Sequence, residues 1–87
     1  TALMLASMNG FTTIVRLLLT KEELDINAKH HVTGNSALHL ASRGGSIKTV
    51  RLLLEHHADP LMENSSGFLP LHLAIAQGHS EVASFLV

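Results

Sequence analysis

Apolar residues recur with a helical period in the clearest stretch of this chain. Ser46 is followed by Ile47, Val50, Leu53 and Leu54, which fall at helical spacing. Residues spaced in this way share one face of a helix, and serine is a favoured residue at the position just before a helix. The pattern therefore predicts a helix that begins after Ser46 and buries one stripe of its surface.

A shorter apolar helix is predicted before it, over residues 37–43, after a turn at residues 34–36. Glycine readily adopts the left-handed conformation that ends many helices. Gly45 is therefore predicted to end this helix, and Gly10 and Gly78 lie at matching places in the chain. Residues 55–67 are rich in turn formers and predict a loop that leads into a projecting hairpin.

The whole pattern repeats along the chain. Ala6, Ala41 and Ala74 begin similar segments and are separated by 35 and 33 residues. A period of this length indicates stacked helix-turn-helix units rather than one globular core. We expect a single all-α solenoid domain over residues 1–87, with units at about 1–33, 34–66 and 67–87, of which the first and last are incomplete.

The leucine-rich segments are expected to form the core of this stack. The runs Leu17–Leu19 and Leu52–Leu54 are predicted to be buried, because neither helix of a unit covers its own apolar face. The end units have a neighbour on one side only. The side chains expected to face water in part are therefore Leu3, Leu5, Phe85 and Leu86.

Composition excludes several classes of protein. The 87 residues contain no cysteine, so neither disulfides nor a cysteine-based zinc site is expected. Six Lys and Arg against seven Asp and Glu provide no basic stripe for nucleic acid. The apolar runs are too short for membrane insertion. We expect an intracellular protein, cytoplasmic or nuclear, in which Lys21, Glu22 and Glu23 form a solvated helix end.

Two segments resemble the signature of a known family. Residues 36–41 and 69–74 resemble the Thr-Pro-Leu-His-x-Ala motif of the ankyrin repeat, and residues 52–59 resemble its Leu-Leu-x-x-Gly-Ala-Asp ending. The resemblance covers essentially the whole chain. Because the chain starts and stops within units, we interpret it as part of a longer ankyrin array.

The resemblance implies roles for individual residues. His39 and His72 are expected to brace the hairpin turns, and Met4 holds the same place in the first unit. Ankyrin arrays bind proteins through hairpin tips and the exposed face of the first helices, which line a concave groove. The corresponding candidates here are Met8, Asn9, His31, Val32, Thr33, Asn35, Arg43, Ser65, Ser66, Phe68, Ala76 and Gln77.

Each of these assignments has an alternative. Phe68 is equally well explained by packing on a neighbouring hairpin, and Arg43 and Gln77 by simple solvation. The pairs His30-His31 and His56-His57 are adjacent in sequence, so their side chains diverge and neither pair is a good chelate. They are interpreted as solvated loop histidines, with adventitious metal binding and a pH or metal sensor as alternatives.

No motif organises a catalytic site, a phosphate-binding loop or a metal centre. We therefore expect no catalytic residue, cofactor, metal or small-molecule substrate. The sequence favours a non-catalytic module that binds a protein partner. The alternative is an intramolecular regulatory or scaffolding segment within a larger enzyme, channel or effector.

Overall fold

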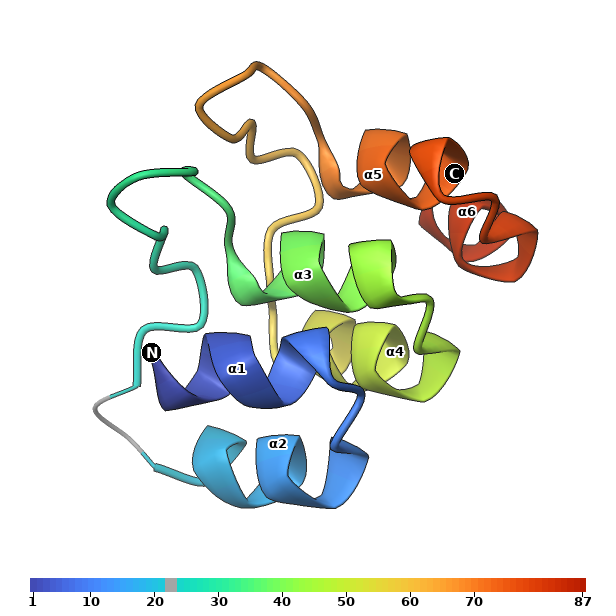
Figure 1. The fold of residues 1–87 in the computed structure, drawn as a ribbon. Helices are drawn as coiled ribbons and strands as arrows, with labels where there is room; N and C mark the ends of the chain where they lie inside the picture. The colour runs from blue at the N-terminus through green and yellow to red at the C-terminus, as the bar shows by residue number, and fades with distance from the viewer. Residues whose placement is uncertain (22–23) are drawn as a thin grey trace.

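The chain folds into a stack of short helices joined by loops (Figure 1). The computed structural model describes residues 1–21 and 24–87. Within these ranges there are six helices and no strand. The helices are α1 (Ala2–Met8), α2 (Thr12–Leu19), α3 (Ala37–Gly44), α4 (Ile47–Glu55), α5 (Pro70–Ala76) and α6 (Ser80–Leu86).

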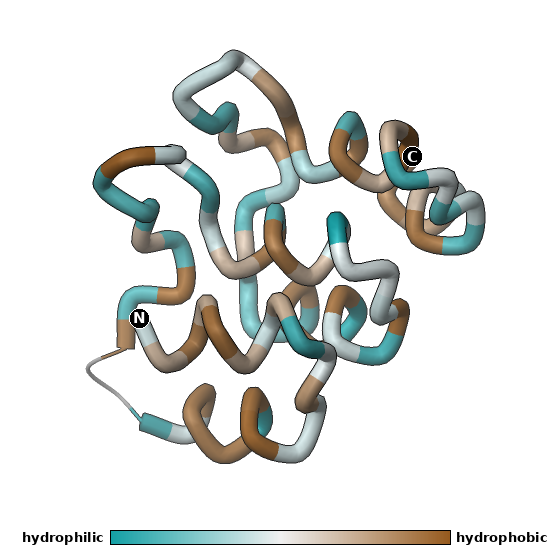
Figure 2. The backbone as a smooth tube through the Cα atoms, viewed as in Figure 1, coloured by the Kyte–Doolittle hydropathy of each residue, from teal (hydrophilic) through white to brown (hydrophobic). Residues whose placement is uncertain are grey.

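The helices lie in two layers. Helix α3 packs between α1 and α5 in the first layer, and α4 packs between α2 and α6 in the second. Each unit contributes one helix to each layer, and the loops after α2 and α4 project beyond the first layer (Figure 1). Apolar segments recur in the helices, whereas the loops are more polar (Figure 2). The predicted all-α solenoid is confirmed.

A capping serine begins one helix, and glycines lie at or just after the ends of three others, where the sequence predicts. Ser46 caps α4, since its Oγ accepts the backbone N–H of Thr49 at 3.4 Å. Gly45 ends α3 with a φ of 79°, and Gly10 and Gly78 have φ values of 69° and 74° just after α1 and α5. These left-handed positions turn the chain sharply into the second helix of each unit.

The core lies between the two layers. Leu38, Val50 and Leu53 are at most 1% exposed. Ala6 and Ala41 are also buried, at equivalent places in successive first helices. Small side chains allow neighbouring helices to approach closely, so the repeated alanine keeps the stack tight.

Two predictions about the core are wrong. Leu17 is 63% exposed, although its counterpart Leu52 is only 5% exposed. Leu52 lies on the side of α4 that faces α2. The equivalent side of α2, which carries Leu17, is not covered by any described helix. Leu3 was expected to face water but is only 3% exposed, because α1 packs against both α2 and α3. Leu5 and Phe85 are exposed as predicted.

The charged segment after α2 is only partly described. Helix α2 ends at Leu19, and exposed Lys21 follows that end. Glu22 and Glu23 lie outside the described residues, so the predicted solvated helix end is not tested there. Among the described residues, no helix is long and apolar enough to cross a membrane.

Candidate functional site

Two projecting loops form one wall of the candidate site. We call residues 30–35 hairpin 1 and residues 64–68 hairpin 2. In hairpin 1 the His30 N–H donates to the Asn35 carbonyl at 2.8 Å, and in hairpin 2 the Asn64 N–H donates to the Phe68 carbonyl at 2.9 Å. The Ser65 N–H donates to the Thr33 carbonyl at 3.0 Å, so a backbone hydrogen bond also joins the two hairpins.

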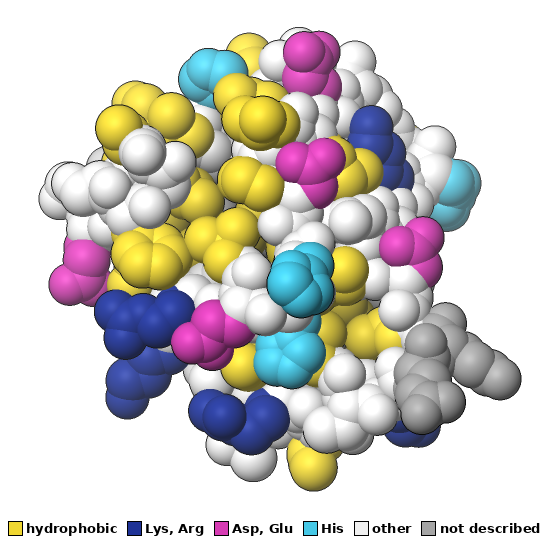
Figure 3. Space-filling model, turned by 180° about the vertical axis from the view of Figure 1, so that it is seen from behind, with side chains coloured by type: hydrophobic (Ala, Val, Ile, Leu, Met, Phe, Trp, Pro, Cys, Tyr) yellow, Lys and Arg dark blue, Asp and Glu magenta, His cyan; other side chains and the backbone are white. Residues whose placement is uncertain are grey.

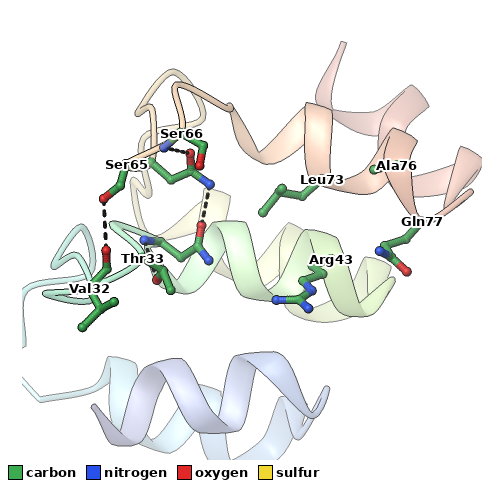
Figure 4. A pocket seen from close by; sticks show the side chains of 10 residues that line it. Val32, Thr33, Arg43, Ser65, Ser66, Leu73, Ala76 and Gln77 are labelled. Atoms are coloured by element: carbon green, nitrogen blue, oxygen red, sulfur yellow. Dashed lines mark hydrogen bonds between the residues drawn. The ribbon is translucent and has the colours of Figure 1, made fainter.

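Asn64 organises hairpin 2 and connects it to hairpin 1. Its Oδ1 accepts the backbone N–H groups of Ser66 and Phe68 at 2.9 and 3.0 Å. Its Nδ2 donates to Oδ1 of Asn35 at 2.8 Å (Figure 4). Asn35 is 7% exposed, so this amide contact is shielded from water. A wall fixed in this way loses little conformational freedom when it binds a ligand.

His39 braces the start of its own helix and the end of hairpin 2. Its Nδ1 accepts the backbone N–H of Ser36 at 3.1 Å, which requires the proton of the neutral ring to sit on Nε2. Nε2 then donates to the Phe68 carbonyl at 2.8 Å. Burial lowers the pKa of His39 below its ordinary value of 6.5; the hydrogen bond to the Phe68 carbonyl opposes this shift in pKa, and the positive charge of Lys29 adds to it. These two contacts are the kind of backbone hydrogen bonds expected of a histidine that braces the hairpin turn.

The same place in the other units shows which part of this brace is general. His72 Nδ1 accepts the backbone N–H of Leu69 at 2.9 Å, as His39 does with Ser36. Met4 lacks a ring and packs as a buried side chain. There the hydroxyl of Thr1 accepts the Met4 N–H at 3.1 Å and caps α1. A side-chain cap at the start of the first helix is therefore present even in the unit where methionine replaces the histidine.

A cavity of about 410 Å³ lies between the hairpins and the first-layer helices (Figure 4). Hairpin side chains form one side of this cavity, and the last turns of α3 and α5 form the other. Its lining residues are Val32, Thr33, Asn35, Arg43, Asn64, Ser65, Ser66, Leu73, Ala76 and Gln77.

A second cavity of about 360 Å³ lies between α1, α3 and hairpin 1. It shares Thr33, Asn35 and Arg43 with the first cavity, so the two hollows are adjacent. We call them together the groove. The remaining lining residues of the second cavity are Thr1, Met4, Leu5, Met8, His30 and Leu40.

One helical position changes its chemistry along the groove. Met8, Arg43 and Ala76 hold equivalent places in α1, α3 and α5, and all three line the groove. The Met8 side is therefore apolar, the centre carries a guanidinium, and the Ala76 side is small and opens toward Gln77. Figure 4 shows Arg43 and Gln77 on the side of the cavity opposite the hairpins.

Most of the predicted binding residues line this groove, but three do not line either cavity. Asn9 ends α1 and donates through Nδ2 to the Leu5 carbonyl at 2.9 Å. The His31 ring stacks on His30 with centroids 4.8 Å apart. The Phe68 ring meets the His72 ring edge-on at 6.0 Å and is 48% exposed. These three residues lie beside the groove rather than in it.

Sequence reasoning missed three leucines in the groove wall. Leu5, Leu40 and Leu73 hold equivalent places in the first-layer helices and line the cavities. In the sequence they look like ordinary core residues. The signal that could have found them is their place in the helix, three residues before Met8, Arg43 and Ala76 and thus on the same face.

The third unit holds the end of α3 in place. His79 Nε2 donates to the Arg43 carbonyl at 3.0 Å. The His79 ring also covers Gly45, where an added Cβ would lie only 2.6 Å from Nδ1. The backbone that carries Arg43 is therefore held by His79 of the third unit, while the Arg43 side chain is exposed.

The histidine pairs do not gather ligands for a metal. His30 Nδ1 accepts the N–H groups of Val32 and Thr33 at 3.2 and 3.3 Å, within its own hairpin. His56 Nδ1 donates to the Leu52 carbonyl at 3.0 Å and ends α4. Among the described residues, no group of three His, Cys, Asp or Glu side chains is arranged to hold an ion.

Comparison with known proteins identifies the family. The family model for ankyrin repeats in three copies matches residues 3–87, so the chain belongs to the ankyrin-repeat family. It is 40% identical to palmitoyltransferase AKR1 of Lachancea kluyveri over 80% of its length. It is also 41% identical, over 84% of its length, to a transient receptor potential cation channel subfamily A member 1 homolog of Caenorhabditis elegans. It covers only 9% and 5% of these two proteins.

A solved structure shows the same arrangement. The chain matches a chain in the complex of the predatory endopeptidase Bd0816 from Bdellovibrio bacteriovorus with immunity protein Bd3460. The TM-score is 0.93 at 30% identity, and the match covers 99% of this chain and 44% of the other. Ankyrin repeats generally mediate protein–protein interaction, and the matched structure is itself a complex of two proteins.

Proposed function

We propose that this segment is a non-catalytic module that binds a protein partner in the groove. The observation that carries the proposal is that two adjacent cavities share Thr33, Asn35 and Arg43 and so follow one another across the units. The groove passes over several units and has walls fixed by hydrogen bonds. Such a preformed surface suits an extended segment of another protein better than a small molecule.

The side chains of the groove support binding rather than chemistry. Its polar groups are an arginine, hydroxyls and amides, and the amides of Asn35 and Asn64 are already paired with each other. The described lining residues include no carboxylate or cysteine, and His30 Nδ1 is occupied by backbone N–H groups. The described lining residues therefore do not pair a nucleophile with a general base, as catalysis of group transfer requires. The setting we propose is intracellular, cytoplasmic or nuclear, where proteins commonly lack structural disulfides.

Affinity capture with a groove variant tests this proposal. The double variant Arg43→Ala, Gln77→Ala removes two exposed groove side chains, and Arg16→Ala removes an arginine from the opposite layer as a matched control. Proteins captured from cell extract by the unmodified chain should be retained by Arg16→Ala and lost from the double variant. Equal capture by all three chains, each shown to be folded by its unfolding transition, would contradict the proposal.

A second candidate function follows from the size of the relatives. The palmitoyltransferase and the channel are much longer than this chain, so an ankyrin segment of this kind commonly belongs to a larger polypeptide. The partner in the groove is then another part of the same protein. Cross-linking of the full-length parent distinguishes the two, because intramolecular links to Lys29, near hairpin 2, would favour this second candidate.

A further inference from the structure

We infer that the groove recognises an extended segment with an acidic side chain about three residues from an apolar one. This inference rests on the proposed function and specifies the chemistry of the partner. It depends on which charges line the groove and on how far apart its apolar and charged parts lie.

Charge favours an acidic ligand at the centre of the groove. Arg43 lines both cavities, and the described lining residues include no Asp or Glu. Its guanidinium is exposed, so a carboxylate can approach it without displacing an ion pair partner from the groove wall. The fork of donors on arginine matches a carboxylate in two parallel hydrogen bonds, which fixes the orientation of the bound segment.

The wall beside Arg43 provides an apolar contact. Leu5, Met8 and Leu40 line the smaller cavity, and Leu5 and Met8 are 60% and 44% exposed. On the other side of Arg43 the lining includes Leu73 and Val32, but also Gln77, the small Ala76 and the serines of hairpin 2, so it is more polar than the α1 side. An apolar side chain of the ligand therefore fits best on the α1 side.

The spacing follows from the packing of the helices. Met8 and Arg43 lie on neighbouring helices of one layer, and such helices pack about 8–10 Å apart. An extended peptide advances about 3.3 Å per residue, so about three residues span this distance. The expected motif is an apolar residue and an Asp or Glu separated by two positions, in one chain direction or the other.

A second basic surface provides the natural comparison. Arg16, Lys48 and Arg51 line a separate hollow of about 320 Å³ in the second layer. Figure 3 shows Lys and Arg side chains gathered at one edge of the molecule seen from behind, with acidic side chains beside them. Glu55 lines this hollow, and Arg51 already lies over the Phe85 ring at 5.5 Å. This surface is therefore less suited to hold a carboxylate than the groove.

Selection from a library of random peptides of 12 residues tests the inference. The unmodified chain and the Arg16→Glu control should enrich peptides that carry the apolar–acidic pair. Arg43→Glu should enrich Lys or Arg at the acidic position instead, because the charge at the centre is reversed. A synthesised winning peptide should bind Arg43→Glu and Arg43→Gln at least about ten-fold more weakly than the unmodified chain. Its affinity for Arg16→Glu should change less than about two-fold.

The outcomes separate this inference from the proposed function. Winning peptides without an excess of Asp or Glu, or peptides that bind Arg43→Glu and Arg43→Gln as tightly as the unmodified chain, would overturn the inference while leaving groove binding intact. Loss of binding in Arg16→Glu would move the carboxylate contact to the second layer and would also overturn it. If no peptide is enriched on any folded variant, the proposed function itself fails.

Discussion

The Nε2 atom of His39 lies 2.8 Å from the carbonyl oxygen of Phe68, so a buried side chain of one unit holds the hairpin of the next. The same ring accepts the N–H of Ser36 through Nδ1. The Ser36 contact requires a neutral imidazole whose Nδ1 carries no proton, whereas Nε2 can donate to Phe68 from either the neutral or the protonated ring. Protonation of His39 would therefore break the brace at Ser36, at the start of α3, and place a charge in the buried side chain that joins the units.

Protonation of His39 should weaken the fold as the pH falls. Its pKa is lowered in the folded chain, mainly by burial, so below about pH 6.5 the unfolded chain binds a proton that the folded chain resists. The free energy of unfolding should therefore be fully retained above this pH and decrease through the acidic range until the folded pKa is reached. Denaturant titrations between pH 4.5 and about pH 8 measure this slope.

The variant His39→Gln identifies the group responsible. It should be less stable at neutral pH and show a flatter pH dependence below about pH 6.5. His72→Gln is the matched control, because His72 makes the equivalent Nδ1 contact while its side chain is exposed. An unchanged slope in His39→Gln would assign the titration to another residue.

Leu53→Ala should lower the free energy of unfolding by about 2–5 kcal/mol, because removal of a fully buried leucine leaves a cavity. Leu17→Ala should cost less than about 0.5 kcal/mol, because Leu17 is 63% exposed. Chemical denaturation of both variants measures the difference. Equal losses would show that the exposed leucine is covered in solution.

Gly34→Ala should separate the two hairpins. Gly34 has a φ of 72°, and an added Cβ would lie 2.5 Å from the backbone nitrogen of Ser65. Backbone strain and this overlap together should cost about 2–4 kcal/mol. Gly78→Ala is the matched control, since its φ is 74° but its Cβ would meet nothing within 4 Å, and strain alone should cost about 1–2 kcal/mol. Equal destabilisation of the two variants would show that the hairpins are not in close contact.

His57→Gly should stabilise the protein by about 1 kcal/mol. His57 has a φ of 70°, which is unfavourable for any residue with a Cβ, and it occupies the glycine position of the repeat motif. His56→Gly should instead destabilise, because His56 has a φ of −100° and donates to the Leu52 carbonyl. Thermal unfolding of both variants checks this, and a lower melting temperature for His57→Gly would show that its imidazole makes a stabilising contact.

Much of the fold could be predicted because its signals are local and repeated. The cap at Ser46 and the left-handed glycines depend on a few neighbouring residues. The recurrence of the same segment around Ala6, Ala41 and Ala74 shows that such local signals repeat along the chain. Burial at the ends of the stack could not be predicted in the same way. Leu17 and Leu52 occupy the same place in the same pattern, and only the presence of a covering helix distinguishes them.

The groove was predicted only in part. Arg43 and Ala76 were found because the family resemblance indicates their position in the first helices. Leu40 and Leu73 were missed because a leucine in an amphipathic helix fits a core as well as a groove wall. Asn64 and Asn35 are joined across 29 residues, and no local pattern reveals such a pair.

Amide chemical-shift mapping of the chain during titration with the tightest selected peptide tests the central claim most directly. The largest shifts are expected at groove residues of the two hairpins and of the first-layer helices, such as Met8, Thr33, Arg43 and Ser66. Residues of the second layer, such as Arg16 and Lys48, should change little. Shifts concentrated on Arg16, Lys48 and Arg51 instead would contradict the account and place the binding surface on the opposite layer.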